Sequence, residues 1–232
     1  MNSKAEKKSY PQYCSVARSL EVAGDRWTLL LIRELSFGPR RFTDLVDGVP
    51  GISRNLLAQR LRHLEEQDIL RRRDLAPPAA RRVYELTDDG RDLAQAMLPL
   101  AAWGVRRLGK RQPGQEYRAH WAAVAMAGFA NRAAARDVHD TYQFVVDEEP
   151  FYFHVDDGRI ELHDGLADVA DVTITTDDET WAAMALGDTD AAEATAAGRV
   201  VVTGSTEAGR RLSAIFSREA MLDDLEGAGL GE

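Results

Sequence analysis

Residues 52–64 constrain the fold of this chain more than any other stretch, because they predict a helix with two unlike sides. Leu57, Leu61 and Leu64 recur with the i, i+4, i+7 spacing of an apolar stripe that packs on a core. Ser53 stands where a helix N-cap is expected, since its hydroxyl can accept a hydrogen bond from an unpaired backbone N–H. The pattern therefore predicts a helix that is buried on one side only.

The other side of this helix carries the side chains that read base edges in a major groove. Arg can bridge guanine O6 and N7, and Asn or Gln can bridge adenine N6 and N7. The N-terminal part of a reading helix enters the groove first. Base contacts are therefore expected from Ser53, Arg54, Asn55 and Gln59. Phosphate contacts are expected from Arg60 and Arg62, and an ordinary solvated helix face is the alternative for both sets.

The charge of the chain is divided unevenly along its length. The formal net charge is −9 at pH 7, yet residues 1–113 hold 21 basic and 14 acidic side chains, whereas residues 114–232 hold 8 and 24. Phosphate binding requires a locally positive surface and does not require a basic chain as a whole. Contact with nucleic acid is therefore expected from the first half, and two domains are expected in the 232 residues.

Other features of the composition narrow the class of protein. No apolar run approaches the roughly 18 residues that cross a membrane, and residues 1–9 are polar and basic, unlike a secretory signal. The single cysteine excludes an internal disulfide framework and fits a reducing cytoplasm. The chain lacks P-loop, dinucleotide-binding and Gly-x-Ser-x-Gly motifs, and its five histidines lack metal-ligand spacing, although His154 and His163 share a predicted hairpin. We therefore expect no enzyme, no metal and no cofactor.

Helical and strand periods predict the order of elements in the first half. Short helices are expected over 15–22, 27–35 and 43–46, and a longer one over 91–108, kinked or broken near Met97 by Pro99. Strands are expected over 69–73 and 82–86, joined by a basic tip that contains Pro77-Pro78. Arg81 and Arg82 on this hairpin are expected to contact phosphate or a minor groove. Three helices, a polar-faced fourth and a basic hairpin predict a winged helix-turn-helix.

The second half changes from helical spacing to alternation. Residues 109–114 are expected to form a linker, followed by a helix over 116–135. Strands are then expected over 142–146, 151–155, 160–163, 172–175 and 200–203, with helices over 179–186, 190–197 and 205–216. The predicted fold class is α+β, with a winged helix-turn-helix domain followed by a small α/β domain that has a mainly antiparallel sheet.

The first half resembles the HxlR-type bacterial transcriptional regulators. The resemblance runs from residue 14 to about 108 and includes the Cys14–Leu35, Arg41–Leu45, Gly51–Leu64, Asp68–Arg71 and Tyr84–Gly90 segments, while Ala79-Ala80 before Arg81 depart from the pattern. It implies double-stranded DNA with a palindromic operator as partner and a homodimer built by the 15–22 and 91–108 helices. A twofold dimer would place its reading helices about one DNA turn, roughly 34 Å, apart. The DNA-binding and dimerisation domain is expected over 1–113.

The second half resembles a sterol-carrier-type domain over 142–216. The resemblance implies that a domain over 142–232, reached through a connecting helix and linker over 114–141, binds a small apolar ligand or serves interaction. The candidate ligand-binding residues are Phe144, Phe151, Phe153, Trp181, Met184 and Phe216, with Trp121 and Phe129 from the preceding helix. The alternatives are that these aromatic residues form an ordinary core, or that the domain only extends the dimer interface.

The predicted function is transcriptional regulation by a cytoplasmic, nucleoid-associated homodimer that responds to a small apolar ligand. One alternative is a lipid carrier that keeps the winged helix as a scaffold. Another is redox or electrophile sensing through Cys14, because some HxlR-type regulators use a cysteine at this position and Arg18 could lower its pKa. A small buried side chain is the interpretation we favour for Cys14.

Overall fold

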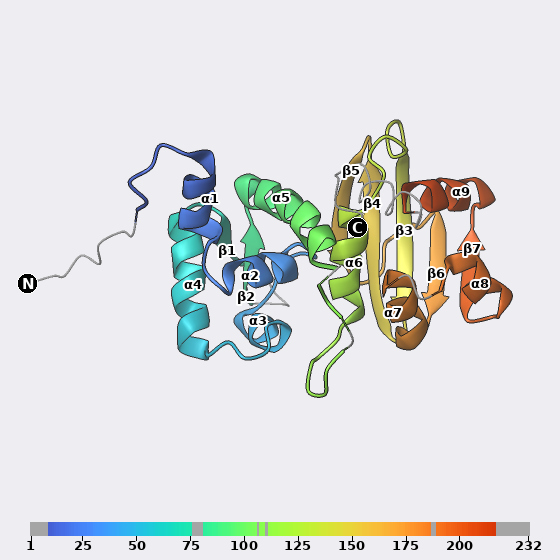
Figure 1. Cartoon of the computed structure of the whole chain (residues 1–232), viewed down its shortest axis with the longest axis horizontal. Helices are drawn as coiled ribbons and strands as arrows, with labels where there is room; N and C mark the ends of the chain where they lie inside the picture. Colours follow the sequence, from blue (N-terminus) through green and yellow to red (C-terminus); the bar gives the residue numbers. More distant parts are fainter. Residues whose placement is uncertain (1–8, 76–80, 106, 110, 187–188, 217–232) are drawn as a thin grey trace, which may run out of the picture. The chain divides into compact units, whose positions relative to one another are not determined.

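The structure, a computed structural model, describes residues 9–75, 81–105, 107–109, 111–186 and 189–216 (Figure 1). Its contacts divide the chain into two compact units. The first comprises Met1–Leu35 and Pro39–Leu93, and the second comprises Ser36–Gly38 and Ala94–Glu232. The predicted α+β class is confirmed, because the first unit combines helices with a hairpin and the second combines helices with a larger sheet.

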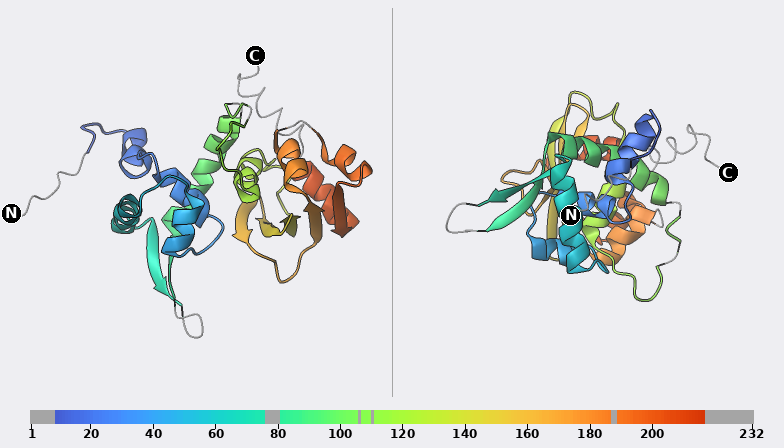
Figure 2. Two further views of the ribbon diagram at one scale, coloured as in Figure 1. Left: turned by 90° about the horizontal axis from the view of Figure 1, so that it is seen from below. Right: turned by 90° about the vertical axis from the view of Figure 1, so that its left-hand side faces the viewer.

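The first unit packs short helices on the buried stripe predicted from the leucine spacing. Its elements are α1 (Ser15–Ala23), α2 (Thr28–Leu35), α3 (Phe42–Gly48), α4 (Arg54–Glu66), β1 (Leu70–Asp74), β2 (Arg82–Leu86) and the start of α5 (Asp88–Val105). Leu57, Leu61 and Leu64 of α4 are 0–1% exposed. The antiparallel β1–β2 hairpin, with Leu70 opposite Leu86, extends beyond the helices in Figure 2.

Helix α5 continues through Pro99, so of the kink or break predicted near Met97 the break is wrong. Proline removes one backbone donor from a helix interior and usually costs stability. Here Met97, Leu98 and Ala102 are buried on the flanking turns while Pro99 itself is exposed. Packing of these side chains therefore offsets the lost hydrogen bond. The helix begins directly after Thr87, whose Oγ1 accepts a hydrogen bond from Gly90 N at 3.1 Å.

Gly90 is required where the first turn of α5 passes the backbone of the preceding hairpin. A Cβ atom at this position would overlap the carbonyl oxygen of Ile69, which is itself fixed by the Thr87 N–H. We expect Gly90→Ala to destabilise the protein by about 3 kcal/mol, because neither backbone can move away freely. Chemical denaturation followed by far-UV circular dichroism measures this loss.

Gly104→Ala is the matched control in the same helix. Its Cβ would meet nothing within 4 Å, so the substitution should stabilise α5 by roughly 0.5–1 kcal/mol. Equal stability of the two variants would contradict the role assigned to Gly90.

The second unit is a five-stranded sheet of order β5-β4-β3-β6-β7. Its strands are β3 (His139–Val146), β4 (Glu149–Asp156), β5 (Arg159–Asp164), β6 (Val172–Thr176) and β7 (Val200–Gly204). All neighbouring pairs are antiparallel except β3 and β6, which run parallel with Tyr142 opposite Val172. The predicted mainly antiparallel sheet is therefore confirmed.

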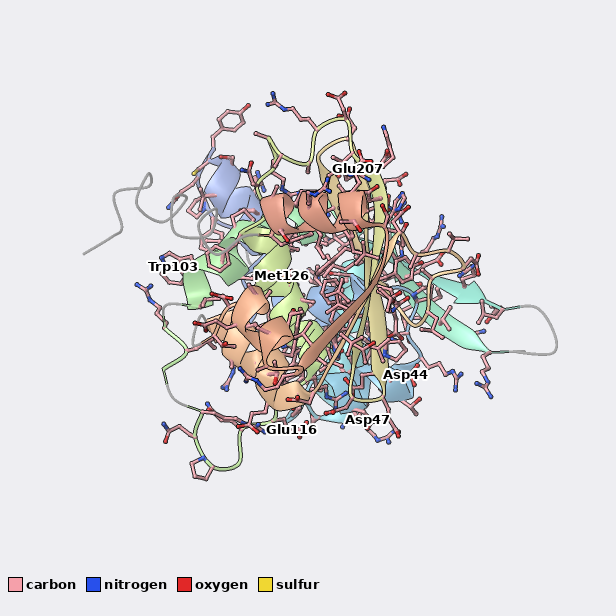
Figure 3. The ribbon with its side chains drawn as sticks, turned by 90° about the vertical axis from the view of Figure 1, so that its right-hand side faces the viewer. Asp44, Asp47, Trp103, Glu116, Met126 and Glu207 are labelled. Atoms are coloured by element: carbon pink, nitrogen blue, oxygen red, sulfur yellow. The ribbon has the colours of Figure 1, made fainter. Side chains whose placement is uncertain are left out.

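Helices cover one face of this sheet. They are α6 (Ala119–Gly128), α7 (Asp178–Leu186), α8 (Ala191–Ala196) and α9 (Thr206–Ile215). Figure 3 shows them on the same side of the strands, with Met126 labelled on α6 and Glu207 on α9. The face they cover buries Tyr142, Phe144, Phe151, Phe153 and Val155, each 2% exposed or less.

Helix α6 is shorter than the helix predicted over 116–135. Arg118 has extended backbone and serves as its N-cap, while Phe129 ends it. Beyond this point the Asn131 side chain accepts hydrogen bonds from Ala133 N and Ala134 N, both at 3.0 Å, and so directs a separate turn. Asp137 then adopts a φ of 56°. Local side-chain hydrogen bonds to the backbone thus compete successfully with helix continuation.

Candidate functional site

The N-terminal part of α4 presents polar side chains on a firmly anchored helix. Ser53 accepts a hydrogen bond from Leu56 N at 3.3 Å, which fixes the first turn. The side chains exposed on this helix include Ser53, Arg54, Asn55, Gln59 and Arg62. The leucine stripe on the opposite side leaves them no room to turn inward, so they face solvent as a group.

Arg60 departs from the expected phosphate contact. Its side chain is 24% exposed and forms a 2.6 Å ion pair with Asp25, which lies in the turn before α2. A guanidinium already paired and partly buried would have to give up this carboxylate before it could bind a phosphate. The ion pair holds α4 on its own unit, and the phosphate contact of Arg60 stays a prediction.

Exposed arginines along the β1–β2 hairpin are paired with carboxylates. Glu85 holds both Arg71 and Arg73, at 2.7 and 2.8 Å. Arg82 pairs with Asp74 at 2.9 Å, and Arg81 is exposed beside it. Such surface pairs contribute roughly 0–1 kcal/mol each, so a phosphate can replace the carboxylate at little cost. The predicted tip with Pro77-Pro78 and Ala79-Ala80 lies outside the described residues.

Large apolar side chains are exposed on the two helices expected to form a dimer. Tyr13, Val16 and Leu20 at α1 are 107%, 62% and 45% exposed, and Leu100 and Trp103 of α5 are 48% and 42% exposed. Trp103 is labelled in Figure 3. Isolated apolar side chains are common on surfaces, but repetition along one helix indicates a contact face.

The favoured interpretation of Cys14 as a buried side chain is wrong, because its thiol is exposed. Cys14 has extended backbone and immediately precedes α1, so its side chain lies outside the packed face of that helix. Arg18, one turn later, donates from Nη1 to Glu21 at 2.8 Å.

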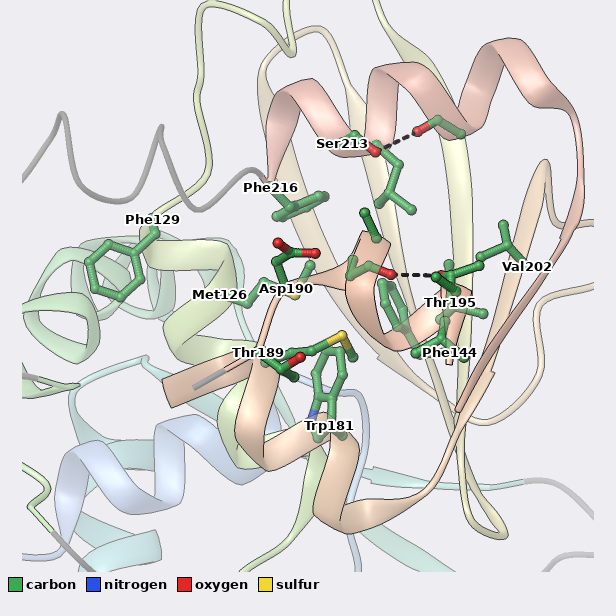
Figure 4. Close-up of a pocket in the computed structure, with 18 of the residues that line it drawn as sticks. Met126, Phe129, Phe144, Trp181, Thr189, Asp190, Thr195, Val202, Ser213 and Phe216 are labelled. Atoms are coloured by element: carbon green, nitrogen blue, oxygen red, sulfur yellow. Dashed lines mark hydrogen bonds between the residues drawn. The ribbon is translucent and has the colours of Figure 1, made fainter. Parts of the chain in front are cut away.

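The second unit contains an apolar cavity of about 820 Å³ between the sheet and its covering helices (Figure 4). This volume lies within the range of small-molecule pockets. The walls come from the sheet and from all four covering helices. The strands contribute Phe144, Ile174, Val200 and Val202, and the segments at α6 and α7 contribute Ala125, Met126, Phe129, Trp181 and Met184. The segments at α8 and α9 contribute Thr189, Asp190, Ala191, Ala192, Thr195, Ala196, Gly209, Leu212, Ser213 and Phe216.

The structure divides the predicted ligand residues into two groups. Those that line the cavity are Phe129, Phe144, Trp181, Met184 and Phe216. Phe151 and Phe153 do not line it, and they pack against Phe144 in the aromatic core. Trp121 is also absent from the walls and contacts His120.

Sequence reasoning missed the contribution of α8 and of Met126. The α8 sequence consists largely of alanine and lacks the large apolar side chains whose spacing predicts a packed face. Small side chains are what keep this wall of the cavity open. The only available signal was the run of small residues between two strands.

A buried polar cluster fixes α9 to the sheet beside the cavity. Arg211 donates to both oxygens of Asp140, at 2.7 and 2.8 Å, and Tyr142 donates its hydroxyl to the same carboxylate at 2.6 Å. Burial raises the pKa of Asp140, but hydrogen bonds from Arg211 and Tyr142 outweigh burial and hold this pKa below its usual value. Tyr142 also packs edge-on against Phe216, a cavity wall, with ring centroids 6.3 Å apart.

His154 and His163 lie on neighbouring strands, as predicted, with His154 opposite Glu161 and His163 stacked on Tyr152. Burial lowers the pKa of His163, and the Glu161 carboxylate opposes this effect. Within the described residues, no group of three or more His, Cys, Asp or Glu side chains is placed to hold a metal ion. None of the helices in the described part of the chain combines the length and the hydropathy of a membrane span.

Both halves of the chain match known family models. Residues 22–112 match the model of the HxlR-like helix-turn-helix, and residues 125–217 match that of the SCP-2 sterol transfer family. The HTH-type transcriptional regulator Rv3095 of Mycobacterium tuberculosis, itself uncharacterized, is 46% identical over 90 residues. These residues are 39% of this chain and 56% of the relative, so the match spans little more than half of the mycobacterial protein.

Two further comparisons involve a regulator from Bacillus subtilis. The HTH-type transcriptional regulator YodB is 34% identical over 85 residues, which make up 37% of this chain and 76% of YodB. The solved reduced form of YodB aligns with 31% identity and a TM-score of 0.37, and covers 45% of this chain and 100% of that structure.

Proposed function

Because the chain belongs to the HxlR-like helix-turn-helix family, we propose that it is a transcriptional regulator that binds an inverted-repeat operator as a homodimer. The observation that carries this proposal is the exposed polar end of α4 on its buried leucine stripe. A helix used only as scaffold has no need of Arg54, Asn55 and Gln59 on one solvent-facing side. Its place of action would be the cytoplasm, at the nucleoid.

The proposed DNA surface combines base-reading and phosphate-holding residues. Ser53, Arg54, Asn55 and Gln59 would meet base edges, since they lie at the start of α4. Arg62, Arg81 and Arg82 would hold phosphates, because all three are exposed. The wing would then fix the orientation of the protein, and α4 would supply the sequence preference.

The proposed dimer would cover the exposed apolar side chains of α1 and α5. Tyr13, Val16, Leu20, Leu100 and Trp103 are the side chains that contact with a second copy would remove from water. Twofold symmetry would then match the two half-sites of a palindrome.

The proposed regulatory input is a small apolar molecule held in the cavity of the second unit. The cavity has the size and the mainly apolar walls of a ligand site. Regulation requires that the ligand favour one of two dimer arrangements over the other, because equal affinity for both shifts nothing. No catalytic step is part of this proposal.

A gel shift with the full chain tests the DNA-binding role. The probes are palindromes from the upstream region of the protein's own gene and a scrambled duplex of equal length. We expect a complex on one palindrome, at a stoichiometry of two chains per duplex by light scattering, that survives excess scrambled competitor. Equal affinity for all duplexes, or no binding to any of them, would favour the alternative of a lipid carrier whose winged helix serves only as a scaffold.

A second candidate input is oxidation or alkylation of Cys14, favoured by the exposure of its thiol. The same gel shift, after treatment with diamide, compares the wild type with Cys14→Ser. Diamide can oxidise the Cys14 thiols of two chains to one disulfide, so altered DNA binding in the wild type alone would support oxidation as the input. An identical response of both proteins would exclude oxidation of Cys14.

A further inference from the structure

Side-chain hydrogen-bond donors in the cavity walls are already used within the protein. Trp181 Nε1 donates to Ala119 O at 2.9 Å. Thr195 Oγ1 donates to Ala191 O at 2.6 Å, and Ser213 Oγ donates to Gly209 O at 3.1 Å (Figure 4). Thr189 Oγ1 donates to the Glu193 carboxylate at 3.3 Å. Each hydroxyl has a single proton, so among the described residues the walls retain acceptor oxygens and no spare side-chain donor.

One wall residue carries a carboxylate, Asp190, which lies at an exposed position. Asp190 Oδ1 accepts a hydrogen bond from Glu193 N at 2.7 Å, whereas no described residue donates to Oδ2. In the view of Figure 4 its carboxylate is drawn between Phe216 and Met126. The walls described here contain no Lys, Arg or His, and residues 114–232 hold 24 acidic against 8 basic side chains. The formal charge on the described walls is therefore negative.

The aromatic walls also favour a positively charged ligand. Phe144, Trp181 and Phe216 line the cavity with aromatic rings, and an aromatic ring attracts a cation held over its face. A ligand carboxylate accepts hydrogen bonds but donates none, so the negative charge of such a ligand would lie unpaired beside Asp190. An amine or a hydroxyl would instead donate to Asp190 Oδ2.

We propose that the cavity selects apolar molecules bearing a hydrogen-bond donor, above all a protonated amine, and rejects carboxylates with the same hydrocarbon part. This inference rests on the ligand-binding role proposed above and assigns the chemical class of that ligand. Asp190 is the residue that determines the preference.

Competition against a neutral fluorescent probe measures the preference in the full chain. N-phenyl-1-naphthylamine is bound first and then displaced at pH 7 by dodecylamine, dodecan-1-ol or dodecanoate, each below its micellar concentration. We expect dodecylamine to bind at least tenfold more tightly than dodecanoate, with dodecan-1-ol between them. The three competitors share one chain length, so the difference reports the head group.

Asp190→Asn and Asp168→Asn form the matched pair of variants. Asparagine is as good an N-cap as aspartate, so the first variant keeps the α8 cap. Asp168 is exposed and lies outside the cavity walls, and its change to asparagine removes the same charge. Asp190→Asn should shrink the amine-to-carboxylate ratio about fivefold or more, and Asp168→Asn should leave it nearly unchanged.

Each other outcome overturns a defined part of the argument. Equal affinities for the three competitors would refute the preference while leaving the cavity as a ligand site. Equal effects of the two variants would refute the assignment to Asp190. Failure of the wild-type protein to bind the neutral probe at all would remove the proposed ligand role, and the inference with it.

Discussion

Arg54→Ala is expected to weaken binding to the operator roughly 5- to 150-fold, equivalent to about 1–3 kcal/mol, while affinity for random DNA changes little. Arg54 is the first residue of α4, directly after the Ser53 cap, and its side chain is exposed. A bidentate contact to guanine is lost with the guanidinium, and the phosphate contacts of other residues remain. Fluorescence anisotropy with specific and scrambled duplexes measures both affinities.

Arg62→Ala is the matched control on the same helix. Arg62 is exposed and would hold a phosphate. Its loss should therefore lower the affinity for specific and random DNA alike and reduce the salt dependence of binding by about one counterion. Arg60→Ala serves as a second control, because Arg60 is paired with Asp25 and should not alter the preference. An equal loss of Arg54→Ala on both duplexes would place Arg54 on phosphate and contradict base reading.

Arg211→Ala is expected to lower the free energy of unfolding by about 3 kcal/mol, since it leaves the buried Asp140 carboxylate without its charged partner, although Tyr142 still donates to it. The side chain of Asp140 is 6% exposed, and Arg211 binds both of its oxygens. Arg210→Ala is the control, because it removes the same charge from an exposed position of the same helix. Urea denaturation monitored by far-UV circular dichroism compares the variants, and equal losses would contradict the role of the pair.

The pH dependence of this loss gives a second readout. In the wild type the pKa of Asp140 is lowered on folding, so its contribution is present above the unfolded value, about 3.9, and disappears as pH falls through the folded value. Without Arg211 the pKa of Asp140 is higher than in the wild type, because burial still raises it and the lowering effect of Arg211 is lost, so the variant's folded state binds a proton at a higher pH. The stability difference between wild type and Arg211→Ala should therefore narrow as pH falls from 6 toward 3. A constant difference would show that the carboxylate is not the group involved.

Much of the first unit was predictable because its signals are local. The leucine spacing and Ser53 defined α4 closely, and alternation with turn residues defined the strands of both sheets. Other departures from the expected picture depend on contacts between residues distant in the sequence. Pro99 was tolerated because buried neighbours hold α5 together, and Arg60 found Asp25 across the unit.

The cavity was only partly predictable for a related reason. Aromatic spacing identifies side chains that avoid water, but it cannot separate a solid core from the wall of a void. Phe144 and Phe151 stack with centroids 5.4 Å apart, yet only Phe144 also lines the cavity. The open space depends on the small side chains of α8, which carry no periodic signal.

The carboxylates along the β1–β2 hairpin have a consequence for how the proposed regulator would search a genome. Each of Arg71, Arg73 and Arg82 must release Glu85 or Asp74 before it can grip a phosphate. Each exchange costs at most about 1 kcal/mol and costs the same on every sequence. Several such exchanges together would shorten dwell times on competing duplex and leave discrimination by α4 unchanged. A hairpin whose arginines are paired with its own carboxylates would thus bind non-specific DNA more weakly and sample sites faster.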